Sequence, residues 1–323
     1  MFNKVDTRIV DARSSRETLE ATTHMNRGAI SLKGSFPPIA TPFDMEGEVD
    51  HRALAENLER WNRYDLAGYV VLGSNGEAVY LTEEEKLRVL EAARRAIPPD
   101  KLMIAGTGLE ATCQTAFLTQ RAAELGADAA LVLTPHYYGG KMTPDSLVQH
   151  YEAVAEDSPI PIVLYNVPKF THVDMDAATI VRAAEHPNIV GIKDSGGNIA
   201  KLADVVRLAA PDFQVLAGSA GFFLAGLSIG AVGGVMALAN VAPQECIDIY
   251  SLFQAGQWDE AAEIQRRMIP VNFAVTGGYG VPGLKAALEM LGWYGGPVRS
   301  PLRDLSDGER RSLREILAHG GLL

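Results

Sequence analysis

Short apolar runs alternate with longer amphipathic stretches along most of the chain from Ser35 onward. Most runs are continuously apolar and rich in Val, Ile and Leu, as expected of parallel strands that are covered on both faces. The stretches between them carry helix signals, such as the capping-box pattern at Thr82–Glu85 and the proline that follows Thr143. The eight runs are Phe36–Thr41, Gly68–Gly73, Leu102–Gly108, Ala129–Pro135, Ile160–Pro168, Ile189–Ser195, Phe213–Ser219 and Ala231–Asn240.

Eight strand–helix units predict an α/β protein with a closed (β/α)₈ TIM barrel. The alternative is a doubly wound open sheet, which would place a glycine-rich dinucleotide turn after the first strand. The segment Ala40–Phe43 is no such turn, so the pattern favours the barrel. We divide the chain into a polar N-terminal extension, residues 1–34, a catalytic barrel, residues 35–242, and a C-terminal helical appendage, residues 243–323.

The composition narrows the possible partners and chemistry. The net charge of −11 argues against binding to nucleic acid or to an anionic membrane surface. No apolar run reaches the ~18–20 residues that a transmembrane helix needs, and Cys113 and Cys246 form no metal or redox motif. The histidines show no zinc-binding spacing, and no strand ends in a Gly-x-Ser-x-Gly elbow. We therefore expect a soluble cytoplasmic protein that works without a metal.

Lys193 is the most informative residue of the sequence, because it is the lone cation in the apolar run Ile189–Ser195. Burial favours the neutral amine of a lysine, which is a nucleophile for carbonyl groups. The alternative is a lysine at a strand end that extends its ammonium into water. Gly191, Lys193 and Ser195 share one face of the predicted strand. Tyr165 ends the preceding strand at a similar height, so we interpret it as a proton-transfer partner rather than a core tyrosine.

The turn Gly73–Glu77 follows the second predicted strand and precedes a helix. Backbone N–H groups at such a position bind anions, and Ser74, Asn75 and Gly76 would together hold a small carboxylate. The alternative is a glycine-rich loop that serves only as a turn, which is how we interpret Gly218–Gly221. An amine, a phenol and a carboxylate site fit carbonyl chemistry through a Schiff base.

Three motifs resemble the dihydrodipicolinate synthase / N-acetylneuraminate lyase family, whose members are Schiff-base enzymes that use or release pyruvate. The resemblance covers the chain from about Phe36 to Leu323, and within the family the chain looks closest to 4-hydroxy-2-oxoglutarate aldolase. It implies that Lys193 forms the imine, that Tyr165 relays protons and that no cofactor is needed. It also implies that Ser74 and Asn75 hold the pyruvyl carboxylate. The motifs are Gly73-Ser74-Asn75-Gly76-Glu77, Tyr165-Asn166-Val167-Pro168 and Gly191-Ile192-Lys193-Asp194.

The resemblance assigns three further residues. Tyr137 matches a tyrosine that reaches the site of a neighbouring subunit, which implies a homodimer or homotetramer, and Ser195 would contact the distal part of the substrate. Phe170 departs from the synthases, which have an arginine at this position for the carboxylate of aspartate semialdehyde. Phenylalanine cannot replace a guanidinium. Strand alternation predicts that Lys169, the preceding residue, faces away from the site.

The resulting hypothesis is a class I aldolase that cleaves a 4-hydroxy-2-oxo acid, with 4-hydroxy-2-oxoglutarate giving pyruvate and glyoxylate. Two alternatives within the family remain open: a synthase that condenses pyruvate with an aldehyde, and a sugar-acid dehydratase or lyase. A third is a non-catalytic barrel that senses 2-oxo acids, although no DNA-binding or signalling module accompanies the barrel.

Overall fold

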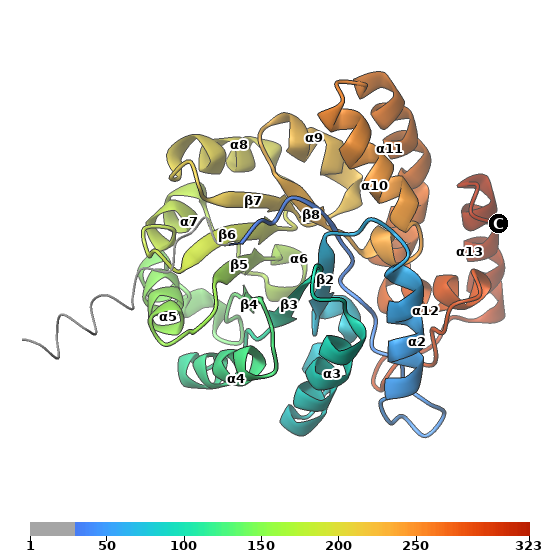
Figure 1. Ribbon diagram of the computed structural model, residues 1–323, viewed down its shortest axis with the longest axis horizontal. Coiled ribbons are helices and arrows are strands. Elements are labelled where there is room, and N and C mark those ends of the chain that lie inside the picture. The colour runs from blue at the N-terminus through green and yellow to red at the C-terminus, as the bar shows by residue number, and fades with distance from the viewer. Residues whose placement is uncertain (1–29) are drawn as a thin grey trace, which may run out of the picture.

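Eight parallel strands form the centre of the structure, a computed structural model that describes residues 30–323. Each strand pairs with its neighbours in the order β1-β8-β7-β6-β5-β4-β3-β2. The Ala67 N–H donates to the Ser35 carbonyl (3.2 Å) and the Ile39 N–H to the Val70 carbonyl (3.0 Å), which closes the circle between β1 and β2. The predicted TIM barrel is therefore confirmed (Figure 1). The strands are β1 (Gly34–Phe36), β2 (Gly68–Val71), β3 (Leu102–Gly106), β4 (Ala129–Leu133), β5 (Ile162–Asn166), β6 (Ile189–Asp194), β7 (Gln214–Ala217) and β8 (Gly233–Val235).

A helix follows each strand and covers the outside of the barrel (Figure 1). The eighth helix, α10, contacts β1 and α9, so the barrel continues past the boundary that we predicted at residue 242. A helical pattern alone does not tell which helix packs on the sheet and which packs on other helices. The eight are α2 (His51–Trp61), α3 (Glu83–Ala96), α4 (Thr112–Glu124), α5 (Pro144–Glu156), α7 (Ala177–Ala183), α8 (Ile199–Leu208), α9 (Phe223–Ser228) and α10 (Pro243–Gln254).

The apolar residues of each strand pack on two sides, inside the barrel and against the surrounding helices. On β5, Val163 and Tyr165 belong to the cluster inside the barrel, whereas Ile162 and Leu164 pack outward among the helices. This alternation explains why the runs read as continuously apolar in the sequence, because both faces of every strand are buried. It also sets which residues at the strand ends face the interior.

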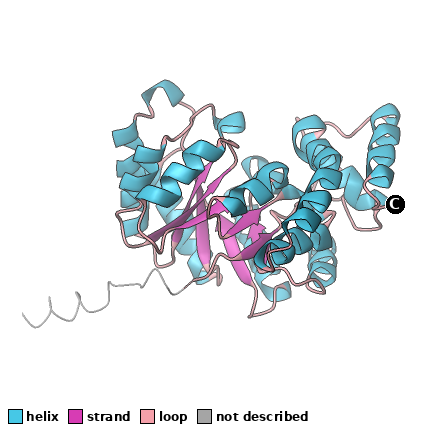
Figure 2. Ribbon diagram, turned by 90° about the horizontal axis from the view of Figure 1, so that it is seen from above, coloured by secondary structure: helices cyan, strands magenta, loops and turns pink. Residues whose placement is uncertain are grey.

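Three further helices form the C-terminal appendage, which stands to one side of the barrel in Figure 2. They are α11 (Trp258–Phe273), α12 (Gly280–Met290) and α13 (Asp307–His319), and a turn of π-helix, η7 (Ala274–Gly278), joins α11 to α12. Within residues 30–323, no helix is both long enough and apolar enough to cross a bilayer.

The N-terminal segment joins the fold earlier than the predicted boundary at residue 34. Leu32 is fully buried, and its N–H donates to Oε1 of Gln214 (2.8 Å). Residues 30–34 therefore pack on the barrel, and the remainder of the predicted extension, residues 1–29, lies outside the described residues.

Candidate active site

Lys193 and Tyr165 lie side by side at the carboxyl ends of β6 and β5, where they are register partners. Lys193 is only 3% exposed, so it does not extend into water as a strand-end lysine would. Its Nζ lies 3.9 Å from the centre of the Tyr165 ring. The amine of Lys193 and the phenol of Tyr165 therefore lie together, as the sequence predicted. They lie at the carboxyl ends of the strands, where TIM-barrel enzymes have their active sites.

The turn after β2 supplies the third polar group. It forms a short 3₁₀-helix, η2 (Ser74–Gly76), and Oγ of Ser74 lies 3.3 Å from the hydroxyl of Tyr165. Gly76 is placed differently from our prediction, because its N–H donates to the Gly73 carbonyl (2.9 Å) and its carbonyl accepts from Oγ1 of Thr41 (2.7 Å). The N–H of Gly76 is therefore engaged within the turn, which leaves Ser74 and its neighbour Asn75 as the polar groups facing the interior.

These residues surround a cavity of about 210 Å³. Six predicted site residues line it: Ser74, Asn75, Tyr165, Phe170, Lys193 and Ser195. Its wall also contains residues that the sequence interpretation did not assign to the site: Pro38, Val167, Lys169, Gly218, Ser219, Val235, Ala237, Val275, Thr276, Gly277, Gly280 and Val281.

The C-terminal appendage completes the cavity, because η7 and the start of α12 provide five lining residues, between Val275 and Val281. Two sequence features mark this segment: the glycines at 277, 278 and 280, and the proline at 270 inside a helical pattern. Such signals mark an irregular helix, and π-turns often occur at functional sites. They do not show against which part of the barrel the segment packs.

The Gly218–Gly221 segment is more than the simple turn that we predicted. Oγ of Ser195 donates to the carbonyl of Gly218 (3.2 Å), and the Gly218 N–H donates to the Asp194 carbonyl (2.7 Å). A Cβ atom on Gly218 would lie 2.1 Å from Oγ of Ser195. A glycine is therefore needed where β6 and β7 approach each other beside the cavity.

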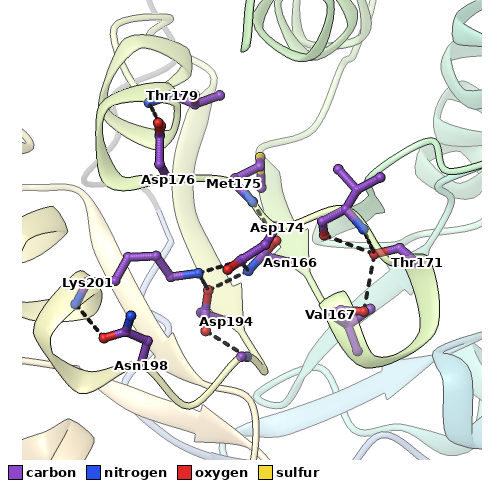
Figure 3. Close-up of polar contacts among 12 residues, drawn as sticks. Asn166, Val167, Thr171, Asp174, Met175, Asp176, Thr179, Asp194, Asn198 and Lys201 are labelled. Atoms are coloured by element: carbon purple, nitrogen blue, oxygen red, sulfur yellow. Dashed lines mark hydrogen bonds and ion pairs between the residues drawn. The ribbon is translucent and has the colours of Figure 1, made fainter. Parts of the chain in front are cut away.

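A polar network that includes the buried side chains of Asn166 and Asp194 lies beside the ends of β5 and β6 (Figure 3). Nδ2 of Asn166 donates to Asp194 (2.7 Å) and to Asp174 (2.8 Å), and Nζ of Lys201 lies 2.8 Å and 2.7 Å from the same two carboxylates. Burial by itself lowers the pKa of Lys201, but the attraction of Asp194 and Asp174 outweighs it, so the pKa is raised. Asn166 follows Tyr165 and Asp194 follows Lys193, so the network fixes both strand ends.

Tyr137 is not among the residues that line this cavity. Its side chain is 76% exposed, and its ring contacts that of Tyr138 edge to face, with centroids 5.0 Å apart. Its role at the site of a neighbouring subunit stays a prediction.

Comparison with known proteins gives one consistent family. The model of the dihydrodipicolinate synthetase family matches residues 31–320. A 4-hydroxy-tetrahydrodipicolinate synthase of Methanothrix thermoacetophila is 37% identical over 88% of this chain and 96% of its own, and one of Syntrophus aciditrophicus is 36% identical over 90% and 99%. These relatives are named as synthases and do not support the closer resemblance to 4-hydroxy-2-oxoglutarate aldolase.

Solved structures agree with this result. Dihydrodipicolinate synthase of Acinetobacter baumannii, solved in complex with pyruvate, is 32% identical, with a TM-score of 0.87 over 91% of this chain and 100% of that chain. A dihydrodipicolinate synthase of Bacillus anthracis is 31% identical, with a TM-score of 0.86 over 90% and 98%. The chain therefore belongs to the dihydrodipicolinate synthetase family and is an enzyme of its Schiff-base-forming aldolase and synthase class.

Proposed function

We propose that this enzyme joins pyruvate to an aldehyde through a Schiff base on Lys193, and that it catalyses the reverse cleavage by the same steps. The observation that carries the proposal is the burial of Lys193 against Tyr165 at the carboxyl end of the barrel. The synthase names of the relatives support condensation as the main direction. The pyruvate complex of the Acinetobacter baumannii enzyme supports pyruvate as the first substrate.

In the proposed reaction the neutral amine of Lys193 attacks C2 of pyruvate, and loss of water gives a protonated imine. The iminium withdraws electrons, so C3 loses a proton and an enamine forms. The enamine carbon attacks the aldehyde carbon, a C–C bond forms, and the aldehyde oxygen takes up a proton. Water then hydrolyses the imine, which releases the product and regenerates the amine.

Two groups beside Lys193 fit the proton transfers and the binding of pyruvate. The hydroxyl of Tyr165 lies 3.3 Å from Oγ of Ser74. A proton can therefore pass between the phenol of Tyr165 and the hydroxyl of Ser74, which also lines the cavity. General acid–base help of this kind contributes about 10²–10⁴-fold to a rate. Ser74 and Asn75 line the cavity, where their side chains would hold the pyruvyl carboxylate.

Cleavage of 4-hydroxy-2-oxoglutarate to pyruvate and glyoxylate is the second candidate. Phe170 argues against aspartate semialdehyde as the aldehyde, because the arginine that binds it in the synthases is missing from this position. In the cleavage direction Tyr165 would take the proton of the C4 hydroxyl while the iminium accepts the electrons of the C3–C4 bond. Supplying 4-hydroxy-2-oxoglutarate and measuring pyruvate release distinguishes this activity from condensation of pyruvate with aspartate semialdehyde.

Borohydride trapping tests the shared chemistry. The wild-type enzyme mixed with pyruvate and borohydride should gain the mass of a reduced pyruvyl group on the peptide that contains Lys193. Lys193→Ala should gain nothing, whereas Lys33→Ala, which removes an exposed lysine near the start of β1, should label like the wild type. Continued labelling of Lys193→Ala would contradict the proposal.

A further inference from the structure

A separate cavity of about 420 Å³ lies where the end of α2 meets the start of α10. Residues 291–293 and 321–322 complete its wall, so the barrel and the C-terminal appendage both contribute to it (Figure 1). It shares no lining residue with the catalytic cavity. Cavities of roughly 300–1,000 Å³ hold small molecules in proteins, so this one has room for a ligand that the Schiff-base chemistry does not use.

Two arginines, Arg60 and Arg63, supply the positive charge of this cavity. They stand three residues apart at the end of α2, a spacing that makes side chains neighbours on a helix surface. Within residues 30–323, neither guanidinium forms an ion pair. Arg52 on the same helix differs, because its Nε lies 2.8 Å from Oε1 of Glu56. Like charges at this spacing repel each other, so an anion bound between Arg60 and Arg63 would stabilise both.

The guanidinium of Arg60 is held in place by uncharged groups. It donates to the carbonyl of Gly292, and its central carbon lies 4.3 Å from the centre of the Trp293 ring. Trp293 in turn stacks on Trp61, which is fully buried, with ring centres 5.1 Å apart. A guanidinium has five N–H donors. Arg60 is therefore a fixed cation that keeps donors for a ligand, and a group fixed in advance loses little freedom when the ligand binds.

The acidic groups around this cavity leave its positive charge in excess. Glu245 is the one acid among the described lining residues, and its Oε1 lies 3.9 Å from a guanidinium nitrogen of Arg267, outside the lining. Glu59, one turn before Arg63, is exposed and forms no ion pair with it in the described chain. The lining is thus positive on a protein whose net charge is −11. Arginines also stabilise a helix C-terminus through the helix dipole, but that role needs no cavity beside them.

A phosphate group fits this arrangement. The planar guanidinium donates two parallel hydrogen bonds to phosphate oxygens, and a phosphate monoester carries about −1.5 to −2 charges at pH 7, which matches two arginines. A neutral ligand would gain nothing from these charges. We propose that Arg60 and Arg63 bind a phosphate group in this cavity, either free phosphate or the phosphate of a small monoester. The site is separate from Lys193, so this inference goes beyond the proposed function and does not depend on it.

Isothermal titration calorimetry on the full chain tests the site with sodium phosphate, glycerol 3-phosphate and glycerol, at constant ionic strength. The wild type should bind one phosphate group per chain and should not bind glycerol. Arg60→Met and Arg63→Met should each weaken phosphate binding about 10- to 100-fold, because a charge-assisted hydrogen bond is lost. Arg52→Met removes an arginine of α2 that does not line the cavity, and it should bind like the wild type.

The two phosphate probes identify the source of the group, since tighter binding of glycerol 3-phosphate indicates a monoester and equal or weaker binding indicates free phosphate. No saturable binding at millimolar concentrations, or an affinity that both arginine variants leave unchanged, overturns the proposal. Arg63 is exposed, so Arg63→Met decides the matter if Arg60→Met does not fold. Arg63→Met should still trap pyruvate with borohydride, which separates a failure of this site from a failure of the Schiff-base function.

Discussion

The ammonium of Lys285 lies 2.7 Å from Oε1 of Glu77, and both side chains are buried. Burial lowers the pKa of Lys285, and the negative charge of Glu77 opposes this effect. Glu77 directly follows Ser74–Gly76 and has a left-handed backbone, with φ of 53°. The ion pair therefore connects α12 of the C-terminal appendage to the turn that holds Ser74 and Asn75 at the cavity.

Removing one partner of this ion pair should lower the stability of the fold. Lys285→Met leaves the carboxylate of Glu77 buried without its counter-ion, which we expect to lower the free energy of unfolding by about 3–5 kcal/mol. The double variant Glu77→Gln/Lys285→Met buries no charge at this position, so its free energy of unfolding should fall by less than that of the single variant. Urea unfolding of both variants checks this order, and a single variant that is as stable as the double one would contradict it. In Lys285→Met the KM for pyruvate should also rise, because the turn is no longer fixed.

Tyr165→Phe should separate proton transfer from imine formation. We expect kcat to fall about 10²–10⁴-fold because the phenol is lost, while borohydride still traps pyruvate on the intact Lys193. Tyr151→Phe is the matched control: Tyr151 is also buried, and its hydroxyl donates to the carbonyl of Val132 (3.3 Å), away from the cavity. Steady-state assays in both directions measure the effect, and equal losses in the two variants would exclude a specific role for Tyr165.

The sequence predicted the barrel and the proximity of Lys193 and Tyr165, because both follow from local rules. Apolar runs and turn signals identify the strands. Alternate residues of a strand face opposite sides of the sheet, which places Lys193 on the same face as Gly191 and Ser195. The rule failed at Lys169, which lines the cavity because a proline begins a helical turn, α6 (Pro168–Thr171). It also did not show why residue 191 is a glycine. A Cβ atom there would lie 2.3 Å from the carbonyl oxygen of Gln214, so the glycine permits close contact between β6 and β7.

Local sequence rules could not predict the contacts between parts of the chain that are far apart in the sequence. The wall that η7 contributes, and the ion pair of Glu77 with Lys285, depend on where the C-terminal appendage docks. The hydrophobic pattern of a helix shows which face is buried but not what covers it. The sequence therefore predicted six residues that line the cavity, and it did not predict the part of the wall that the C-terminal appendage supplies.

Lys201→Met should destabilise the polar network of Asn166, Asp174 and Asp194. Asp194 is 0% exposed and would lose its counter-ion, so we expect the free energy of unfolding to fall by about 3–5 kcal/mol. Asp174→Asn is the matched control, because Asp174 is 54% exposed and its pairing is worth at most about 1 kcal/mol. Thermal unfolding and the rate of pyruvate trapping test both variants. Equal stability of the two would show that Lys201 does not support Asp194.

His150 should make the stability of the protein depend on pH. This residue of α5 is buried, Nδ1 lies 2.9 Å from Oγ1 of Thr112, and burial lowers its pKa from 6.5 to about 4. Between these two values the unfolded chain binds more protons than the folded one, so stability falls as the pH decreases through this window. The full effect of this one group is about 3 kcal/mol.

His150→Gln keeps a hydrogen-bonding side chain at this position and removes the titration. Urea unfolding at a series of pH values between about 7 and 4 should therefore show a shallower loss of stability in this variant than in the wild type. His319→Gln is the control, because His319 lies exposed at the end of α13 and its replacement should leave the slope unchanged. If His150→Gln and the wild type lose stability in parallel, the pH dependence originates from other groups, and the burial of a neutral imidazole at α5 does not govern it.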